Sequence, residues 1–514
     1  MIRTASRRWV AAVAALGLGA SLVVASTSTA TAATAKVLNV GSAYNPGAKG
    51  YNPQLTNGQP FFWEMLYDGL FVTGADGAVK PSLVTTYSYS ADNTKLTLNL
   101  RSGVKFTDGS MLTPQLVKAN LDRRSDTTLL AYGNIRKGGT YEVTSVDVDG
   151  DSVVITFAKA QANGISAFVD ETGFIVGAKG VLDTKALAAT PDGCGPYTLV
   201  KSGTIKNSRY TMAKNAKYWN AKSYTFDQIV YRIFATDQAQ ANAYVSGQVA
   251  YAILDSNSTL SFLQSRKASL ASMGGKISML LFWDKLGKNV PAFKDVRVRQ
   301  AIGYAIDRNA YVSALHKGDA ATANAVAKGF PGYVASLDTT FAYNVAKAKQ
   351  LLADAGYANG FTFTVTIGAD VASEYAFIAK QLSAVGITMN TKVAASTEES
   401  FGAVMTEGLG LLPGVGMTQP FGFFVGVVVN GFANMQKASD PTVGAAVGQF
   451  IGAGDDKAKQ KAALEALNTA LVTQAWITPL FETKIYVAYN PKVLKKVAFE
   501  QGVSQPHLWT LKAL

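Results

Sequence analysis

The 514-residue sequence contains one cysteine, Cys194, and only two histidines, His316 and His507. A single cysteine excludes an intramolecular disulfide framework and a cysteine-based zinc site. With only two histidines, the sequence is poorly supplied for a histidine-rich metal site or a Ser-His-Asp triad. The sequence also has no GxSxG motif and no HExxH motif. We therefore predict that the protein is not an enzyme and that it has no catalytic residues, no cofactor and no metal site.

Charged residues are also scarce, at 16% of the sequence, whereas apolar residues make up 48%. This balance is typical of a folded globular protein rather than a disordered one. The chain is longer than a single hydrophobic core usually supports, which predicts two or three domains. The formal net charge is +13. Because the lysines and arginines are scattered without a basic run, we expect a generally basic surface and no nucleic-acid partner.

One apolar stretch near the amino terminus, Trp9–Val24, has the pattern of a signal peptide. Its positive residues and small-residue cleavage motifs are Arg3, Arg7, Arg8, Ala30–Ala32 and Ala33–Ala35. We predict a cleaved signal peptide over residues 1–35, with Sec export favoured over a twin-arginine signal. No cysteine precedes Cys194, so we expect no lipid anchor. The predicted location is extracytoplasmic: the periplasm, the cell envelope or the medium.

Helices and strands alternate in the second half of the chain. Asp295 is a good N-cap for a helix with an apolar stripe, and Asn344 is a good N-cap for a helix that Gly356 would end. Phe361–Ile367 then alternates apolar residues with threonines, as a half-buried strand does. This alternation of helix, glycine and strand predicts an α/β protein built in layers.

Six short motifs together resemble one family of proteins. They are Leu66–Phe71, Leu96–Arg101 with Phe106–Gly109, Gly193–Tyr197, Lys214–Trp219, Asp295–Arg308 and Ala346–Gly356. Their order resembles that of the extracytoplasmic solute-binding proteins of ABC transporters, in the peptide, oligopeptide and nickel group known as family 5. Each motif alone is weak evidence for the family. Six motifs in the same order, spanning nearly the whole predicted mature chain, are strong evidence.

The resemblance implies an α/β fold with two lobes, of the type II periplasmic-binding-protein class, with an extra domain and a hinge between the lobes. We assign residues 36–70, 186–272 and 485–514 to lobe I, residues 71–185 to the extra domain and residues 273–484 to lobe II. No catalytic group is needed, because such a protein works by binding and by a shift from an open to a closed population.

The function that the resemblance implies is that of the exported binding component of an ABC importer. Its expected partners are a peptide or other small-molecule ligand and the permease subunits in the membrane, and the protein itself is expected to be a monomer. Two alternatives stay open. One is a sensor or chaperone-like binding protein of the same fold, and the other is an importer protein for a glycoside or a metal chelate.

Most of the shared motifs are expected to hold the fold. Asp108 is predicted to cap backbone amides in a tight turn, and Cys194 is predicted to be a small buried residue. Three charged residues near one helix are expected to form ion pairs on its surface; they are Arg297, Arg299 and Asp307.

The sequence departs from the peptide-binding relatives in one loop. In those relatives the loop resembles Trp-x-x-Asp-Tyr-x-x-Pro, and its aspartate pairs with the amine of a bound peptide. Alignment on Pro420 places Gly416 at the position of the aspartate, and no acidic residue lies between Glu407 and Asp440. Since a buried ammonium without a carboxylate is costly, we predict a ligand with a less charged end. Such a ligand would be a blocked or cyclic peptide, a glycoside or another apolar metabolite.

The candidate ligand-binding residues come from this loop and from positions that commonly line the cleft in the family. They are Tyr44, Asn45, Trp283, Asp284, Gly416, Met417, Phe421, Phe423, Phe481 and Glu482. In a second interpretation the phenylalanines belong to the core, and Glu482 or Asp284 replaces the missing acid.

Overall fold

The computed structural model of the protein describes residues 35–514 apart from a few short segments. The segments left out are 56–59, 75–77, 162, 255–258, 396–398, 401, 404–406, 417–419, 455 and 500–504. All but the last residue of the predicted signal peptide lies outside this description. Within the described part, no helix has the length and apolar character needed to cross a membrane.

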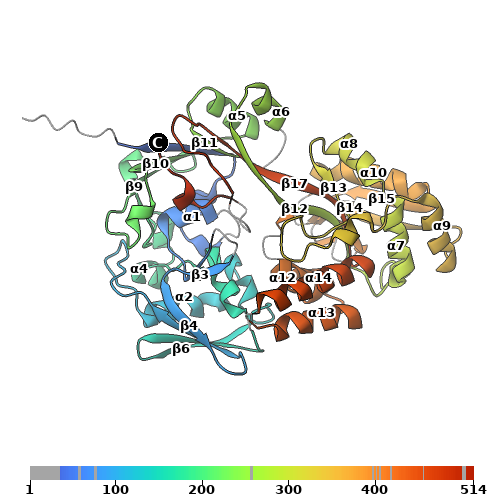
Figure 1. Ribbon diagram of the computed structural model, residues 1–514, viewed down its shortest axis with the longest axis horizontal. Helices are drawn as coiled ribbons and strands as arrows, with labels where there is room; N and C mark the ends of the chain where they lie inside the picture. The colour runs from blue at the N-terminus through green and yellow to red at the C-terminus, as the bar shows by residue number, and fades with distance from the viewer. Residues whose placement is uncertain are drawn as a thin grey trace, which may run out of the picture. The chain divides into compact units, whose positions relative to one another are not determined.

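A nine-stranded mixed sheet runs through much of the molecule (Figure 1). Its order is β16 (Leu409–Gly416), β12 (Leu270–Phe282), β17 (Ile477–Tyr489), β11 (Tyr251–Leu254), β1 (Val37–Ser42), β10 (Gln228–Ile233), β9 (Arg209–Lys214) and β8 (Tyr197–Leu199), and β13 (Ala320–Ala321) pairs with β17. β1 is parallel to β10 and β11, whereas β12 is antiparallel to β16 and β17. The neighbours in this sheet are far apart in sequence, so the chain crosses it several times.

β12 and β17 are the longest strands, with 13 residues each, and they pair along most of their length. The carboxyl-terminal end of β17 pairs with β11, and Phe481 and Glu482 nearer its middle pair with β13. The two strands therefore connect the predicted lobe I to the predicted lobe II (Figure 1).

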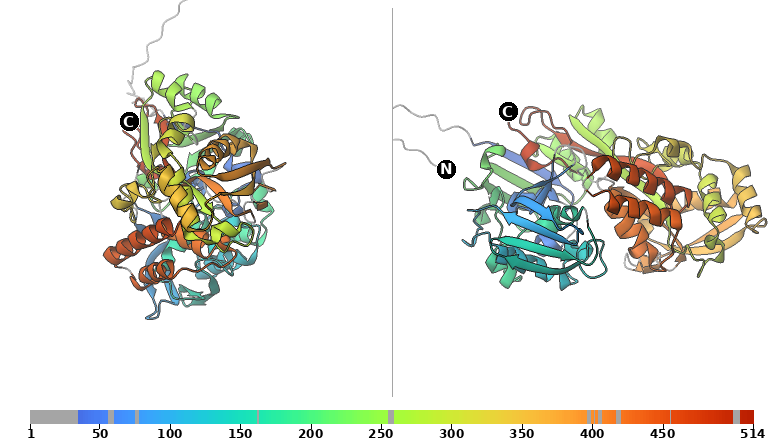
Figure 2. Two further views of the ribbon diagram at one scale, coloured as in Figure 1. Left: turned by 90° about the vertical axis from the view of Figure 1, so that its right-hand side faces the viewer. Right: turned by 60° about the horizontal axis from the view of Figure 1, so that its bottom comes forward.

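Successive residues of β12 point to opposite faces of the sheet. Met279 and Leu281 lie in one apolar cluster and Leu280 and Phe282 lie in another. The first cluster includes residues of α12 (Pro420–Phe423), the π-helix Phe424–Val429, α13 (Pro441–Gly452) and α14 (Lys457–Thr473). The second includes residues of α7 (Val296–Ala305), α8 (Arg308–Leu315), α9 (Val345–Asp354), β14 (Phe361–Ile367), α10 (Ala372–Ser383) and β15 (Ile387–Val393). Figure 2 shows the two sets of helices as separate groups.

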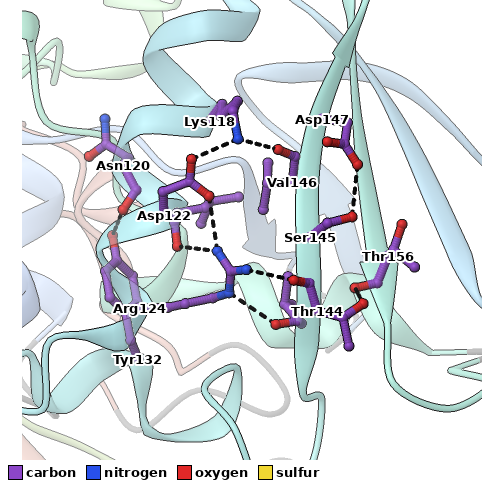
Figure 3. A network of polar contacts seen from close by, with 12 residues as sticks. Lys118, Asn120, Asp122, Arg124, Tyr132, Thr144, Ser145, Val146, Asp147 and Thr156 are labelled. Atoms are coloured by element: carbon purple, nitrogen blue, oxygen red, sulfur yellow. Dashed lines mark hydrogen bonds and ion pairs between the residues drawn. The ribbon is translucent and has the colours of Figure 1, made fainter.

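A separate four-stranded antiparallel sheet falls within residues 71–185, with its own core. Its order is β4 (Val84–Tyr89), β5 (Lys95–Leu100), β7 (Ser152–Phe157) and β6 (Val143–Asp149). α2 (Pro114–Asp122) is fastened to β6 by two basic side chains (Figure 3). Arg124 donates to the carbonyls of Val143 and Thr144 at 3.0 and 3.1 Å, and Lys118 donates to the carbonyl of Val146 at 2.6 Å. The boundaries of the predicted extra domain stay a prediction.

The remaining elements are short. They are α1 (Pro60–Leu66), β2 (Phe71–Thr73), β3 (Val79–Pro81), α3 (Asp170–Gly173), α4 (Ala178–Leu182), α5 (Asp237–Val245) and α6 (Leu260–Ser265). Directly after α1, buried Asp68 accepts hydrogen bonds from Ser82, Tyr218 and Trp219 at 2.7, 2.8 and 2.6 Å. One carboxylate thus joins two of the motifs that suggested the family, which gives them a structural role.

Several local predictions can be compared with the structure. Asp295 and Asn344 cap α7 and α9, and Gly356 follows α9 with φ of +87°, as predicted. Cys194 is buried, also as predicted. Asp108 accepts hydrogen bonds from the amides of Ser110 and Lys179 at 2.7 and 2.9 Å, which confirms its capping role.

The predicted ion pairs are only partly correct. Arg297 pairs with Asp295 at 2.5 Å. The prediction for Arg299 is wrong, because its buried guanidinium donates to main-chain carbonyls, including that of Ala475 at 3.1 Å. The prediction for Asp307 is also wrong, because its carboxylate caps α8 through the amide of Ala310 at 3.0 Å.

Candidate functional site

β16 ends at Gly416, the position that the sequence analysis predicts to replace an acid of peptide-binding relatives. Gly416 is its last residue and lies opposite Lys276 of β12. Gly416 is exposed, and a Cβ built on it would meet no atom within 4 Å. A side chain therefore fits at this position without disturbing the fold. Met417, another predicted ligand contact, lies outside the described residues.

A cavity of about 600 Å³ lies between residues of the predicted extra domain and residues of the predicted lobe II, and we call it the interlobe pocket. Its extra-domain side is formed by Gly138–Thr140, Glu142 and residues 158–161. Its lobe II side is formed by Phe421, Val425, Val429, Asn430, Asn434, Lys437–Asp440, Val443, Gly444, Val447, Ile451 and Trp476. The two sides come close together at one point, where a Cβ built on Gly426 would lie 2.4 Å from Thr140 Oγ1.

The walls of the interlobe pocket combine apolar side chains with polar groups, of which the buried Thr140 hydroxyl has no hydrogen-bond partner among the described residues and the two carboxylates do. Glu142 accepts a hydrogen bond from the amide of Gly138 at 3.0 Å. Asp440 accepts from the amides of Thr442 and Val443 at 2.8 and 3.1 Å, as the N-cap of α13. Both carboxylates that line the pocket are thus engaged locally.

The phenylalanines after Gly416 divide between the pocket and the core. Phe421 lines the interlobe pocket and stacks on Phe450, with ring centroids 3.7 Å apart. Phe424 is fully buried, whereas Phe423 is only partly buried and packs against it. Both interpretations of this segment therefore hold for some of its residues, and the ligand contacts of Phe421 and Phe423 stay predictions.

Sequence reasoning missed Trp476, which lines the interlobe pocket directly before β17. Behind its ring lies the buried Lys285, whose Nζ is 4.8 Å from the ring centroid. Lys285 Nζ also donates to the carbonyls of Phe282 and Ala433 at 2.7 and 2.8 Å. Burial is the main cause that lowers the pKa of Lys285 to about 7, and the nearby Arg299 adds to it. No motif in the sequence signals this pair, because the two residues lie on different segments.

Asp284 and Trp283 are both buried after β12. The Asp284 carboxylate accepts hydrogen bonds from three backbone amides of the following loop and from Gln436 Nε2, at 2.7 to 2.8 Å. Burial alone would raise the pKa of Asp284, but these hydrogen bonds outweigh it and lower the pKa. Trp283 belongs to the same apolar cluster as Phe421. These contacts give Asp284 a structural task, and a ligand contact there stays a prediction.

Phe481 and Glu482 lie on opposite faces of β17. Phe481 lines a second cavity, of about 630 Å³, which we call the hinge pocket because it adjoins β12, β16 and β17. Glu482 lies opposite Ile277 and is half-buried. Burial is the largest cause that raises the pKa of Glu482, although a hydrogen bond from the Gly275 amide opposes it. Glu482 and Asp284 were the candidates for the missing acid. Asp284 is occupied by its full set of hydrogen-bond donors, and Glu482 is not.

Tyr44 and Asn45 follow β1. Tyr44 is 43% exposed, and its amide donates to Ser42 Oγ at 3.1 Å. Asn45 donates to Asn207 Oδ1 and accepts from the hydroxyl of Tyr210, both at 2.9 Å. The Asn45 side chain thus fastens the segment after β1 to β9, and Tyr44 has the freer side chain.

The predicted site residues therefore do not form one cluster. Phe421 lies in the interlobe pocket, Phe481 lies in the hinge pocket, and Asp284 and Asn45 bind neighbouring protein groups. Across the described part of the chain, no group of three or more His, Cys, Asp and Glu side chains is placed to hold a metal ion.

Comparison with known proteins identifies the family. Residues 78–411 match the model of the bacterial extracellular solute-binding proteins, family 5, middle region. The chain belongs to this family. The predicted resemblance is thereby confirmed.

Individual relatives are more distant. The glutathione-binding protein GsiB of Shigella flexneri is 28% identical over 305 residues, which cover 58% of this chain and 57% of GsiB. The chain thus spans little more than half of this curated relative.

Solved structures of the same fold cover more of the chain. HbpA2 from Haemophilus parasuis has a TM-score of 0.75 at 19% identity, covering 93% of this chain and 100% of HbpA2. DppA from Helicobacter pylori, in complex with the peptide STSA, has a TM-score of 0.73 at 19% identity, covering 93% and 98%. These likenesses confirm the predicted α/β fold of the type II periplasmic-binding-protein class.

Proposed function

We propose that this protein is the exported binding component of an ABC importer, and that it captures a peptide or peptide-like ligand between its lobes and delivers it to a permease. Membership of family 5 supports this proposal. The name of GsiB and the peptide bound to DppA support a ligand of peptide character. The coarser conclusion, that the protein is a family 5 solute-binding protein, follows from the family match.

The observation that carries the proposal is the composition of the interlobe pocket. Its walls come from residues 138–161 on one side and residues 421–476 on the other. A ligand held there contacts both sides at once and stabilises the arrangement in which they lie together. Binding of this kind changes the relative population of closed molecules, which is the signal that a permease can recognise.

The pocket also supports the predicted chemistry of the ligand. Gly416 offers no acid at the end of β16, and the two carboxylates of the pocket lining, Glu142 and Asp440, each accept backbone hydrogen bonds. An ammonium buried away from these two carboxylates would lack a partner and would lose several kcal/mol, on the order of the usual penalty. The apolar side chains of Val425 and Ile451 instead favour a blocked or cyclic peptide, or a ligand with an apolar end.

Calorimetry with matched peptides tests the proposal. We expect N-acetylated apolar di- and tripeptides to bind more tightly than the same peptides with a free amine. Mass spectrometry of small molecules released from the purified protein by denaturation identifies candidates for the natural ligand. Tighter binding of the free peptides would contradict the proposed chemistry, and failure to bind any peptide would contradict the proposed ligand class.

A variant pair locates the binding to the interlobe pocket. Ile451 lies on α13 at the pocket and is 40% exposed, so Ile451→Glu leaves the core intact. We expect this substitution to weaken peptide binding at least tenfold, because it places a charge against an apolar ligand group. Gln449→Glu adds the same charge at an exposed position of the same helix, outside the pocket lining, and should bind normally.

A further inference from the structure

The hinge pocket lies on the other face of the sheet from the interlobe pocket. Phe481 of the hinge pocket belongs to the same apolar cluster as Leu280 and Phe282 of β12. Phe421 and Trp476 of the interlobe pocket belong to the cluster of Met279, which points to the opposite face. The hinge pocket is therefore a separate cavity, and it needs an explanation of its own.

Three lysines from three different segments line the hinge pocket. Lys276 comes from β12 and Lys317 follows α8, whereas Lys484 of β17 borders the pocket with its backbone, because its side chain points to the face of Glu482. Among the residues that the structure describes, none of the three has a carboxylate oxygen within 4.0 Å of its ammonium. Lys484 has a longer-range electrostatic effect on Glu482. The pocket thus gathers positive charge without pairing it.

The one carboxylate in the lining does not balance these charges. Asp319 has a side chain that is only 5% exposed. It accepts a hydrogen bond from Thr483 Oγ1 at 3.1 Å and lies 4.0 Å from His316 Nδ1. It is thus engaged with neutral groups of the protein.

His316 adds a polar group that lacks a hydrogen bond. Its ring stacks on Phe481 with centroids 3.9 Å apart. Its Nε2 atom is buried and forms no hydrogen bond, and the nearest carboxylate oxygen, of Glu374, is 3.8 Å away. Burial is the main cause that lowers the pKa of His316, although the nearby Glu374 opposes it. A neutral imidazole can donate one hydrogen bond to an acceptor that enters the pocket.

We propose that the hinge pocket binds a small anion with several oxygen atoms, either a phosphate or a di- or tricarboxylate. Concave sites with unpaired ammonium groups raise the local concentration of anions, and charge-assisted hydrogen bonds to lysine are among the stronger ones. Ser278 accepts a hydrogen bond from the Gly414 amide at 2.9 Å, which leaves its own hydroxyl proton to donate. The cavity is large enough for an anion of this size with its residual water.

The position of this site has a mechanical consequence. Its lining includes Leu254 at the end of β11 and Pro413 of β16, which belong to the predicted lobes I and II. An anion there lies across the strands that join them. The proposal rests on the lysines alone and does not depend on the proposed importer function.

Isothermal titration calorimetry of the mature chain tests the proposal, with inorganic phosphate and citrate as separate probes in a low-salt buffer without other polyvalent anions. We expect one equivalent of at least one probe to bind. The double substitution Lys276→Gln and Lys317→Gln should weaken that binding at least tenfold. The matched control is Lys347→Gln with Lys349→Gln, two exposed lysines on α9, which should leave it unchanged.

Three outcomes decide the matter. Binding of phosphate alone or of citrate alone supports the site and shows which anion geometry it accepts. Absence of binding by both probes, or an equal loss in the control pair, overturns the proposal, because general surface charge would then explain the data. Ile451→Glu should bind the anion normally, so a failure of the peptide proposal can be told apart from a failure of this one. Unchanged thermal unfolding of each variant confirms that it is folded.

Discussion

The ammonium of Lys285 lies 4.8 Å from the ring centroid of Trp476, and that ring forms part of the interlobe pocket. A cation over an indole face is an attractive contact, and it is stronger where water is excluded. Lys285 is nevertheless buried without a carboxylate partner among its hydrogen bonds, which go to two main-chain carbonyls. The pair therefore stabilises the pocket wall at the cost of desolvating a charge.

Lys285 should make the stability of the protein depend on pH. Its pKa is about 7 in the folded protein, against roughly 10.4 for an unfolded lysine. Between these values the unfolded chain binds more protons, so the free energy of unfolding should rise with pH, by up to about 1.4 kcal/mol per pH unit. Urea unfolding of the wild type and Lys285→Met between pH 7 and 10 measures this, and the variant should lack the extra slope.

An exposed lysine supplies the control for this titration. Lys347→Met removes a surface charge on α9 and should keep the pH dependence of the wild type. An equal slope in Lys285→Met and the wild type would show that Lys285 keeps an ordinary pKa.

Restoring the missing acid should change the preference of the protein. Gly416→Asp places a carboxylate at the end of β16, in a position where a Cβ meets no atom within 4 Å. We expect the ratio of affinities for free and N-acetylated peptides to shift at least fivefold towards the free amine, because the ammonium gains a partner. Calorimetry with both peptides measures the ratio.

Gly416→Asn separates charge from size in the same experiment. It adds a side chain of nearly the same volume without the negative charge, so it should leave the ratio close to that of the wild type. An equal shift in both variants would mean that steric contact, and not charge, governs this position.

The contact between Thr140 and Gly426 should limit how closely the two sides of the interlobe pocket approach. A Cβ at position 426 would lie 2.4 Å from Thr140 Oγ1, so Gly426→Val forces the two sides apart. We expect weaker ligand binding and a larger radius of gyration by small-angle X-ray scattering in the presence of ligand.

Gly422→Val is the matched control, because a Cβ at position 422 of the preceding helix α12 meets nothing within 4 Å. It introduces the same branched side chain and should bind ligand as the wild type does. Normal binding by Gly426→Val would show that the pocket does not depend on this approach.

Asp108 should contribute to stability and not to binding. Asp108→Ala removes the acceptor for the amides of Ser110 and Lys179, which should lower the free energy of unfolding by about 1–2 kcal/mol. Peptide affinity should stay within twofold of the wild-type value at a temperature where both proteins are folded. A large loss of affinity without a loss of stability would place Asp108 in the ligand site.

The sequence motifs predicted the scaffold well because their residues meet local requirements of the backbone, such as close packing and helix capping. Gly195 fits closely against α1, where its amide donates to the Leu66 carbonyl at 3.0 Å and a Cβ would lie 2.5 Å from the carbonyl carbon. Asn344 caps α9 with its own side chain. Such requirements recur wherever the same backbone occurs, so they leave a readable pattern.

The pockets could not be predicted in the same way. Thr140 and Trp476 line one cavity although they lie in different domains of the predicted organisation, and Lys276 and Lys317 come to the other cavity from a strand and from the turn after α8. Their residue types follow no local rule of backbone geometry. Arg299 and Asp307 show the same limit, since charge spacing suggested surface ion pairs where burial and helix capping decide their partners.

Because side chains alternate along β12, the two cavities lie on opposite faces of the same strand, and a change in its curvature affects both. Met279 faces the side of the interlobe pocket, and its neighbour Leu280 faces the side of the hinge pocket. When a pair of strands bends towards one face, the side chains on that face move closer together and those on the other face move apart. A ligand bound on the stretched face therefore opposes the return of the strands to their earlier curvature. Ligand binding in the hinge pocket and in the interlobe pocket would thus each depend on the curvature of the same two strands.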